Sequence, residues 1–221
     1  MCRDGGTGRR SGLKILRSNP CGFESLSRHQ VGDMAWLIVV LSYLIGSIPT
    51  AYLAGIFSRG IDIRDMGDGN MGAQNVFRQI NPLPGIIVGL FDAGKGLLVI
   101  LLARVAGLSL GWVFAAGIVA VIGHNWPVYL GFRGGRGEAA TIGILYALIP
   151  VPALILTIPG ILILSLTRNV TLSSAIIFIS MPFICWWQHV EGVVIAYSIG
   201  LLLLVGFTHI LRSRRIAARH A

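Results

Sequence analysis

The sequence predicts an all-α integral membrane protein with about seven transmembrane helices joined by glycine-rich cytoplasmic loops. Three observations lead to this fold class. The 221 residues are 54% hydrophobic and only 12% charged, with a mean hydropathy of +0.76, which leaves too little polar surface for a soluble globule. Apolar runs of roughly 20 residues recur, each long enough to cross a bilayer as a helix. Basic residues collect in alternate connectors between these runs.

The chain begins with a polar segment, residues 1–33, that holds six lysine or arginine residues and no apolar periodicity. A signal peptide needs an apolar stretch before its cleavage site, and this segment has none. Apolar sequence begins abruptly at Met34. We therefore expect residues 1–33 to be a disordered extension, or an over-extended reading frame whose true start is Met34. A single membrane domain is expected over residues 34–210, with a basic cytoplasmic tail over 211–221.

Six apolar stretches follow Met34, and five of them predict one span each. These five cover residues 34–57, 84–103, 110–130, 172–187 and 193–210. The remaining stretch, residues 139–166, is ambiguous. As one helix it would be about 42 Å long at roughly 1.5 Å per residue, and Pro150 and Pro152 interrupt it. As two helices, each would be short.

The distribution of arginine favours two helices in residues 139–166. With seven spans, connectors 58–83, 131–138 and 167–171 share one side of the membrane with the chain from 209 onward. That side then carries Arg59, Arg64, Arg78, Arg133, Arg136, Arg168, Arg212, Arg214, Arg215 and Arg219. The opposite connectors carry only Arg104. A single crossing would translocate the last four arginines, against the positive-inside rule, so we predict seven spans with the carboxyl end in the cytoplasm.

Charge and cysteine content exclude several other classes of protein. The net charge of +9 comes from basic residues in short connectors and at both ends, and no basic patch interleaved with aromatics indicates a nucleic-acid site. The three cysteines are Cys2, Cys21 and Cys185, and their spacing suits neither a metal site nor a disulfide framework. We expect no metal and no cofactor.

The connector after the first span contains a segment that combines glycines with amides and ends in an arginine. Glycine permits positive φ and close backbone approach, so successive N–H groups can form a concave anion site. Asparagine adds donors, and arginine can hold a phosphate with two hydrogen bonds. The residues concerned are Gly67, Gly69, Asn70, Gly72, Asn75 and Arg78. An ordinary turn-rich membrane loop is the competing interpretation.

A second connector repeats this design. Gly134, Gly135, Arg136 and Gly137 place bare backbone and a cation just before a predicted helix, whose N-terminus attracts anions. The segment before it contains His124 and Asn125, and the histidine can equally be a satisfied interfacial side chain. Two such loops on one side of the membrane predict a site for an oligoanion.

Polar residues inside the apolar runs are further candidates. Asp92 and Lys95 share one helix face at positions i and i+3. Charges within a membrane usually face a bundle interior or a cavity, so the two form either a mutually neutralised structural pair or part of a substrate site. Ser173 and Ser174 follow Arg168 and serve either as helix caps or as another wall of the same site.

These segments together resemble the bacterial acyl-phosphate:glycerol-3-phosphate acyltransferase family of the PlsY type. The matching segments are Tyr43-Leu44-Ile45-Gly46-Ser47-Ile48-Pro49-Thr50-Ala51-Tyr52, the loop from Gly67 to Arg78, Asp92-x-x-Lys95-Gly96, and Gly123-His124-Asn125-x-Pro127 through Gly137. They occur in the family's order between about residues 34 and 210.

The resemblance implies a membrane acyltransferase domain with seven spans. It would move an acyl group from acyl phosphate to the sn-1 hydroxyl of glycerol 3-phosphate, giving lysophosphatidic acid for phospholipid biosynthesis. An acyl phosphate is already activated, so positioning and charge stabilisation can supply much of the acceleration, and the donor's own phosphate can serve as general base. The protein would be a monomer in the bacterial inner membrane, with active-site loops and C-terminus cytoplasmic. Its partners would be the two substrates and the lipid bilayer.

On this interpretation each candidate residue has an expected role. The expected catalytic residues are Asp68, Asn70, Arg78, Arg136 and His209. The expected substrate-binding residues are Gly67, Gly69, Gly72, Asn75, Lys95, His124, Asn125, Gly134, Gly135, Gly137, Ser173 and Ser174.

The chain departs from the family pattern at several positions. Where the family has Ser, Thr, Lys, Val and Thr, this chain has Asp68, Gln74, Arg136, Glu138 and Ala140. After His209 it also lacks the Asn and Glu that the family carries.

Asp68 is the departure with the largest consequence, because a carboxylate repels bound phosphate. It is tolerated if Arg78 or Arg136 neutralises it, or if it acts as the base that deprotonates the acceptor hydroxyl. A third interpretation is that the acceptor is another alcohol and the chain is a divergent paralogue. An inactive scaffold and a small anion transporter also compete with the acyltransferase, although no inverted repeat supports a transporter.

Overall fold

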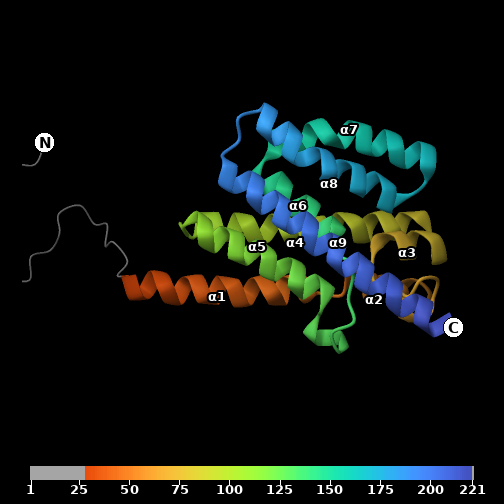
Figure 1. Ribbon diagram of the computed structural model, residues 1–221. Helices are drawn as coiled ribbons and strands as arrows, with labels where there is room; N and C mark the ends of the chain where they lie inside the picture. Colours follow the sequence, from red (N-terminus) through yellow and green to blue (C-terminus); the bar gives the residue numbers. More distant parts are fainter. Residues whose placement is uncertain (1–27, 221) are drawn as a thin grey trace, which may run out of the picture.

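The computed structural model describes residues 28–220, and side chains over residues 32–212. Residues 1–27 and 221, which include most of the predicted extension, lie outside the described part. Within it the chain is helical and has no strand (Figure 1). The elements are α1 (Arg28–Ser47), α2 (Thr50–Arg59), η1 (Ile63–Asp65), α3 (Ala73–Gln79), α4 (Pro82–Val105), α5 (Leu110–Asn125), η2 (Val128–Leu130), α6 (Glu138–Leu148), α7 (Pro150–Thr167), α8 (Val170–Trp187) and α9 (Gly192–His220).

The predicted membrane fold is confirmed. Six helical segments in the described part are long and apolar enough to cross a bilayer: Gly32–Arg59, Pro82–Val105, Leu110–Leu130, Pro150–Thr167, Val170–Trp187 and Gly192–Arg212. The shorter α6 is the seventh apolar segment, below the length of these six. The exposed aliphatic and aromatic side chains on these helices are the surface that lipid would cover.

Residues 139–166 form two helices, as the arginine distribution predicted. α6 ends at Leu148 and α7 begins at Pro150. The ring of Pro150 disfavours helical backbone at Ile149, whose φ and ψ are −136° and 67°. At roughly 1.5 Å per residue, α6 is about 16 Å long, close to half of the roughly 30 Å hydrocarbon core. α6 is therefore too short to span the core alone.

Four helix boundaries differ from the sequence prediction. α1 begins at Arg28, so residues 28–33 are helical although we expected them to precede the domain. The first apolar run breaks before α2, because Pro49 has no N–H to continue the ladder. α5 ends at Asn125, just before Pro127. α9 continues to His220, so the predicted tail over 211–221 extends this helix as far as it is described.

Small residues let the central helices approach closely. A Cβ at Gly96 of α4 would overlap the carbonyl oxygen of Ala140 in α6, and a Cβ at Gly143 of α6 would overlap that of Ala93 in α4. In lipid the hydrophobic effect does not drive helices together, so close backbone packing at small residues stabilises their association. The α4–α6 pair is therefore the rigid base from which the loop before α6 projects.

Replacing Gly143 with alanine is expected to destabilise the fold by about 1–3 kcal/mol, because the methyl group must push α6 away from α4. Thermal unfolding of the detergent-solubilised protein measures this as a lower Tm. Gly94→Ala is the matched control, since nothing lies within 4 Å of a Cβ at Gly94 and alanine is the better helix former. Equal Tm values for the two variants would contradict the close-packing interpretation.

Candidate active site

The first glycine-rich loop, residues 66–72, is folded around the side chain of Asn75. The Nδ2 of Asn75 donates hydrogen bonds to the carbonyls of Ile63, Met66 and Asn70 at 3.1, 2.9 and 3.1 Å. Gly67 has φ +59°, and a Cβ there would overlap the Asn75 amide. Asn75 and Gly67 therefore shape the loop from behind and line neither of the two cavities described below.

An ion pair fixes the segment that leads into this loop. Asp62 Oδ1 accepts the backbone N–H of Arg64 at 2.9 Å, and its Oδ2 lies 2.6 Å from Arg64 Nη2. The hydrogen-bonded guanidinium lowers the pKa of Asp62 below its usual value, while partial burial opposes this shift. The guanidinium carbon also lies 5.3 Å from the ring centroid of Tyr52. These contacts hold Arg64 at the edge of the loop.

The second glycine-rich loop, residues 131–137, lies flat against the end of α5. Gly135 N–H donates to the carbonyl of His124 at 3.0 Å. A Cβ at Gly134 would overlap that carbonyl and a Cβ at Gly135 would overlap the His124 ring, so neither position has room for a side chain. The carbonyl of Met71, from the first loop, is also within 2.9 Å of a Cβ at Gly135. The two loops thus meet at one end of the helix bundle.

The two loops and α9 enclose a polar cavity of about 320 Å³. Its lining combines carboxylates with four arginines. The residues are Asp62, Arg64, Asp65, Asp68, Gly69, Asn70, Arg133, Gly134, Arg136 and Arg212. Arg212, which the sequence left within the tail, donates from Nη2 to the carbonyl of Asn125 at 2.6 Å. This contact brings the C-terminal part of α9 over the loops.

A second, more apolar cavity of about 260 Å³ adjoins it. We call it the inner cavity; its walls come from α3 and α4 on one side and from α6 and α8 on the other. Its lining residues are Asn70, Gly72, Ala73, Gln74, Gly89, Asp92, Ala93, His124, Arg136, Gly137, Glu138, Ala139, Ile142, Val170 and Ser174. Asn70 and Arg136 line both cavities and therefore mark their junction.

Both junction residues carry polar atoms that no other described residue satisfies. Asn70 Oδ1 and Arg136 Nε are buried without a hydrogen-bond partner in the described part of the chain. Buried polar groups in proteins are nearly always paired. An unpaired acceptor and an unpaired donor at the junction suit a ligand that offers a hydroxyl and an anionic oxygen there.

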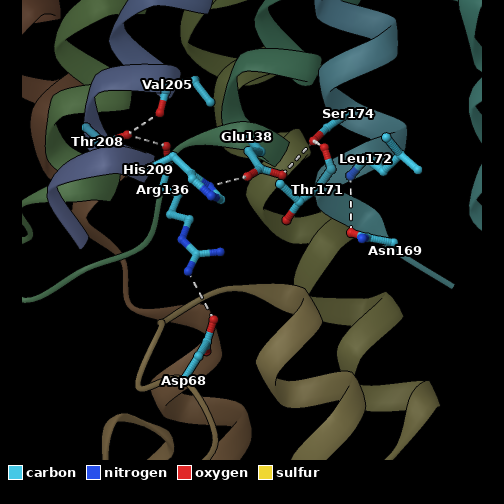
Figure 2. A network of polar contacts seen from close by, with 10 residues as sticks. All are labelled: Asp68, Arg136, Glu138, Asn169, Thr171, Leu172, Ser174, Val205, Thr208 and His209. Carbon is cyan, nitrogen blue, oxygen red and sulfur yellow. Dashed lines mark hydrogen bonds and ion pairs between the residues drawn. The ribbon is translucent and has the colours of Figure 1, made fainter. Parts of the chain in front are cut away.

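Figure 2 shows the polar contacts around Arg136. Arg136 Nη2 lies 3.1 Å from Asp68 Oδ2, and Asp68 Oδ1 accepts the N–H of Asn70 at 3.1 Å. On its other side, the carbonyl of Arg136 accepts a hydrogen bond from Thr208 of α9 at 3.0 Å. Asp68 is therefore neutralised by Arg136, as one of the sequence interpretations expected, and Arg78 takes no part.

Glu138 links three helices beside Arg136 (Figure 2). Its Oε2 accepts a hydrogen bond from Ser174 of α8 at 2.9 Å, and its Oε1 lies 3.8 Å from Nδ1 of His209 in α9. His209 itself lines neither cavity. Ser173, the neighbour of Ser174, faces α7, where it donates to the carbonyl of Gly160 at 2.6 Å.

An apolar groove of about 770 Å³ continues from the inner cavity. It shares Ala73, Gln74, Gly89 and Val170 with that cavity. Aliphatic and aromatic residues of α3, α4 and α7 line it, together with Arg78 and Arg168. The structure thus places Arg78 at the groove, apart from the Arg136 junction where we expected it.

The buried ion pair of Asp92 and Lys95 in α4 is bonded to the turn between α1 and α2. Lys95 Nζ donates to Asp92 Oδ1 at 2.6 Å, to the carbonyl of Ile48 at 2.6 Å and to Thr50 at 3.2 Å. Lys95 lines neither cavity, whereas Asp92 and His124, 3.7 Å apart, lie beneath the inner cavity. The contacts favour the structural interpretation of this pair, which anchors the turn between α1 and α2 to α4.

The structure brings many of the predicted site residues together at the two cavities. Those that line one or both are Asp68, Gly69, Asn70, Gly72, His124, Gly134, Arg136, Gly137 and Ser174. Those that line neither are Gly67, Asn75, Arg78, Lys95, Asn125, Gly135, Ser173 and His209. Glu138 and Arg212 line the cavities but were absent from the predicted site. Among the described residues no group of three His, Cys, Asp or Glu side chains could hold a metal ion.

Comparisons with known proteins agree with this geometry. A family model described as glycerol-3-phosphate acyltransferase matches residues 36–219. Glycerol-3-phosphate acyltransferase 4 of Dehalococcoides mccartyi is 50% identical over 182 residues, 82% of this chain and 98% of the relative. A glycerol-3-phosphate acyltransferase of Synechococcus sp. is 39% identical over 184 residues, 82% of this chain and 91% of the relative.

A solved structure shares the fold. The crystal structure of PlsY (YgiH), an integral membrane glycerol 3-phosphate acyltransferase in its glycerol 3-phosphate form, superposes with a TM-score of 0.74 and 30% sequence identity, covering 84% of this chain and 92% of that one. The family model and the solved structure therefore each cover most of the chain. The chain belongs to the glycerol-3-phosphate acyltransferase family.

Proposed function

We propose that the protein transfers a fatty acyl group from acyl phosphate to the sn-1 hydroxyl of glycerol 3-phosphate, giving lysophosphatidic acid and phosphate. The observation that carries this proposal is the junction of an arginine-lined cavity with an apolar one at Asn70 and Arg136. Such a junction suits a reaction between a small anionic alcohol and an amphiphilic acyl donor. Family membership supports the acceptor.

The polar cavity suits the phosphate of the acceptor. Four arginines line it, and arginine binds phosphate through charge-assisted, often bidentate hydrogen bonds. Gly69 and Gly134 contribute bare backbone to the same wall. Glycerol 3-phosphate bound there by Arg133 and Arg212 would extend its sn-1 hydroxyl toward Asn70, whose Oδ1 can accept a hydrogen bond from that hydroxyl.

The inner cavity and the apolar groove suit the acyl donor. The groove lies among membrane helices and offers aliphatic walls for a chain that resides in the bilayer. Arg78 and Arg168 beside it favour the approach of an anionic amphiphile. With its chain in the groove, the donor would place its phosphate at Arg136, where the unpaired Nε can donate to it.

The reaction needs no redox change and is balanced by one proton transfer. The acceptor oxygen forms a bond to the acyl carbon, and the bond from that carbon to the phosphate oxygen breaks. The proton of the hydroxyl ends on the departing phosphate. Arg136 would stabilise the negative charge that develops on this leaving group, which is commonly the largest catalytic contribution in acyl transfer.

We also propose that the loops and carboxyl end face the cytoplasm of a bacterial inner membrane and that the protein acts as a monomer. The arginine asymmetry supports this orientation, because Arg104 is the single arginine on the opposite connectors. Labelling of single cysteines introduced at Gly60 and Gly192, in intact cells with a membrane-impermeant maleimide, tests it. Only the position at Gly192 should react.

The activity is tested with the purified protein in nanodiscs, palmitoyl phosphate and labelled glycerol 3-phosphate, with product detected by mass. Lysophosphatidic acid is the expected product. Palmitoyl coenzyme A and palmitoylated carrier protein serve as comparison donors, and glycerol and other alcohol phosphates as comparison acceptors. Product formed only with another acceptor would support a divergent paralogue. No product with any combination of donor and acceptor would support an inactive scaffold.

Replacing Asp68 with serine is expected to lower the KM for the acyl phosphate donor by about two- to fivefold and to leave kcat unchanged. The reason is that Asp68 competes with substrate phosphate for Arg136 through a partly exposed ion pair, and such pairs contribute about 0.2–1 kcal/mol. Steady-state kinetics measures both constants. A large fall in kcat would instead establish Asp68 as the base that deprotonates the acceptor.

A further inference from the structure

We propose that Glu138 is a catalytic residue of this enzyme and that its carboxylate accepts the proton of the acceptor hydroxyl. The inference rests on the proposed acyl transfer and adds a general base to it. Glu138 lines the inner cavity two residues from Arg136, on the side where the acyl carbon would lie.

Three of the four other carboxylates that line the two cavities, Asp62, Asp68 and Asp92, are paired with cations, and the fourth, Asp65, lines only the polar cavity. Asp68 is bound to Arg136 Nη2 and to the N–H of Asn70. Asp92 Oδ1 accepts a hydrogen bond from Lys95 Nζ at 2.6 Å, and Asp92 is 1% exposed. Asp62 is paired with Arg64. Glu138, in contrast, is bonded to a neutral hydroxyl, that of Ser174, at 2.9 Å.

The backbone around Glu138 places this carboxylate and Arg136 on opposite sides of one glycine. Gly137 has φ +85°, a conformation that residues other than glycine rarely adopt. This turn sends Arg136 toward Asp68 and Glu138 toward α8 and α9 (Figure 2). Residues 136–138 thereby supply both the cation for the leaving group, Arg136, and the base, Glu138. The hydrogen bond from Thr208 to the Arg136 carbonyl holds this segment against α9.

Ser174 and His209 act as positioning residues for the carboxylate. The Ser174 hydroxyl holds Oε2, and the Nδ1 edge of the His209 ring lies 3.8 Å from Oε1, within ion-pair range but too long for a hydrogen bond. Because the contacts come from α8 and α9, they restrict the rotamers of a side chain that starts on α6. A base must be held within hydrogen-bond reach of the proton that it accepts.

The proposed step keeps atoms and charge balanced. As the acceptor oxygen bonds to the acyl carbon, its proton passes to a carboxylate oxygen of Glu138. The bond from the acyl carbon to the phosphate oxygen then breaks, with Arg136 stabilising the phosphate. Protonated Glu138 returns the proton to the departing phosphate, which restores the carboxylate for the next turnover.

Glu138→Gln tests the proposal, because glutamine keeps the size and the hydrogen bond to Ser174 but cannot accept the proton. We expect kcat to fall about 10²-fold, in the usual range for a general base, while KM for both substrates changes less than about threefold. Glu191→Gln is the matched control, since Glu191 is an exposed acid just before α9. It should retain wild-type kinetics.

Chemical rescue distinguishes a general base from a residue that only supports the structure of the site. In Glu138→Ala, added formate can occupy the vacated space and accept the proton, so part of kcat should return with rising formate concentration. Formate should not affect the wild type, Glu191→Gln or Glu138→Gln. The wild-type Tm, together with its increase on addition of glycerol 3-phosphate, shows whether each variant is folded.

The outcomes distinguish the two proposals. If the wild type makes no lysophosphatidic acid from acyl phosphate, the proposed function fails. If the wild type is active but Glu138→Gln keeps kcat within about threefold, or formate fails to rescue Glu138→Ala, Glu138 is not the base. A loss seen only in KM would likewise overturn the proposal, because it would indicate a binding role.

Discussion

Replacing Arg136 with alanine is expected to lower kcat/KM for acyl transfer by about 10²- to 10³-fold, the loss typical for removal of one preorganised group that stabilises developing negative charge. Arg136 lines both cavities, and its side chain is only 10% exposed. The change therefore leaves a desolvated junction without its cation. Initial rates of lysophosphatidic acid formation, measured across concentrations of both substrates, report the effect.

Two further variants make the Arg136 result specific. Arg136→Lys keeps the charge but loses the planar fork, so its activity should lie between those of alanine and wild type. Arg104→Lys is the control, because Arg104 lies in the last turn of α4, donates to the Ala147 carbonyl of α6 and lines neither cavity. Folding should survive in both Arg136 variants, since Thr208 binds the backbone carbonyl of residue 136 and not its side chain. Wild-type kinetics in Arg136→Ala would remove Arg136 from the reaction.

The helical membrane fold was predictable because bilayer thickness and charge asymmetry act directly on the sequence. A span must be about 20 apolar residues long, and prolines mark where such a run must break. Pro150 therefore predicted the division between α6 and α7. The break at Pro49 was missed, because the apolar run from residue 34 to 57 continues across it. Apolar character does not reveal a turn that is stabilised by Lys95 from another helix.

The candidate site was only partly predictable, because sequence shows which groups are available and not which ones face each other. The loop glycines and Arg136 stood out by composition. Arg212 did not, since only the packing of α9 brings it to Asn125. Arg78 shares the first loop's sequence, but α3 carries it toward the apolar groove. Glu138 was visible as an added acid, although its contact with Ser174 depends on a neighbouring helix.

Replacing Lys95 with methionine is expected to destabilise the protein by about 3–5 kcal/mol, the cost of leaving a buried charge without its partner. Asp92 is 1% exposed and lies 2.6 Å from Lys95 Nζ. Methionine removes the ammonium and leaves the carboxylate within a membrane helix, where an isolated charge is costly. The carbonyl of Ile48 loses its donor as well. The Tm of the detergent-solubilised protein should fall far more than in Gly94→Ala.

Pairing this change with Asp92→Leu separates a structural role from a catalytic one. Removing both charges should recover much of the lost stability, because two apolar groups of similar size need no mutual neutralisation. If the pair only anchors the α1–α2 turn, the stabilised double variant should also recover acyl transfer per folded molecule. If stability returns and activity does not, Asp92 beneath the inner cavity takes part in the reaction, and the structural interpretation of the pair is wrong.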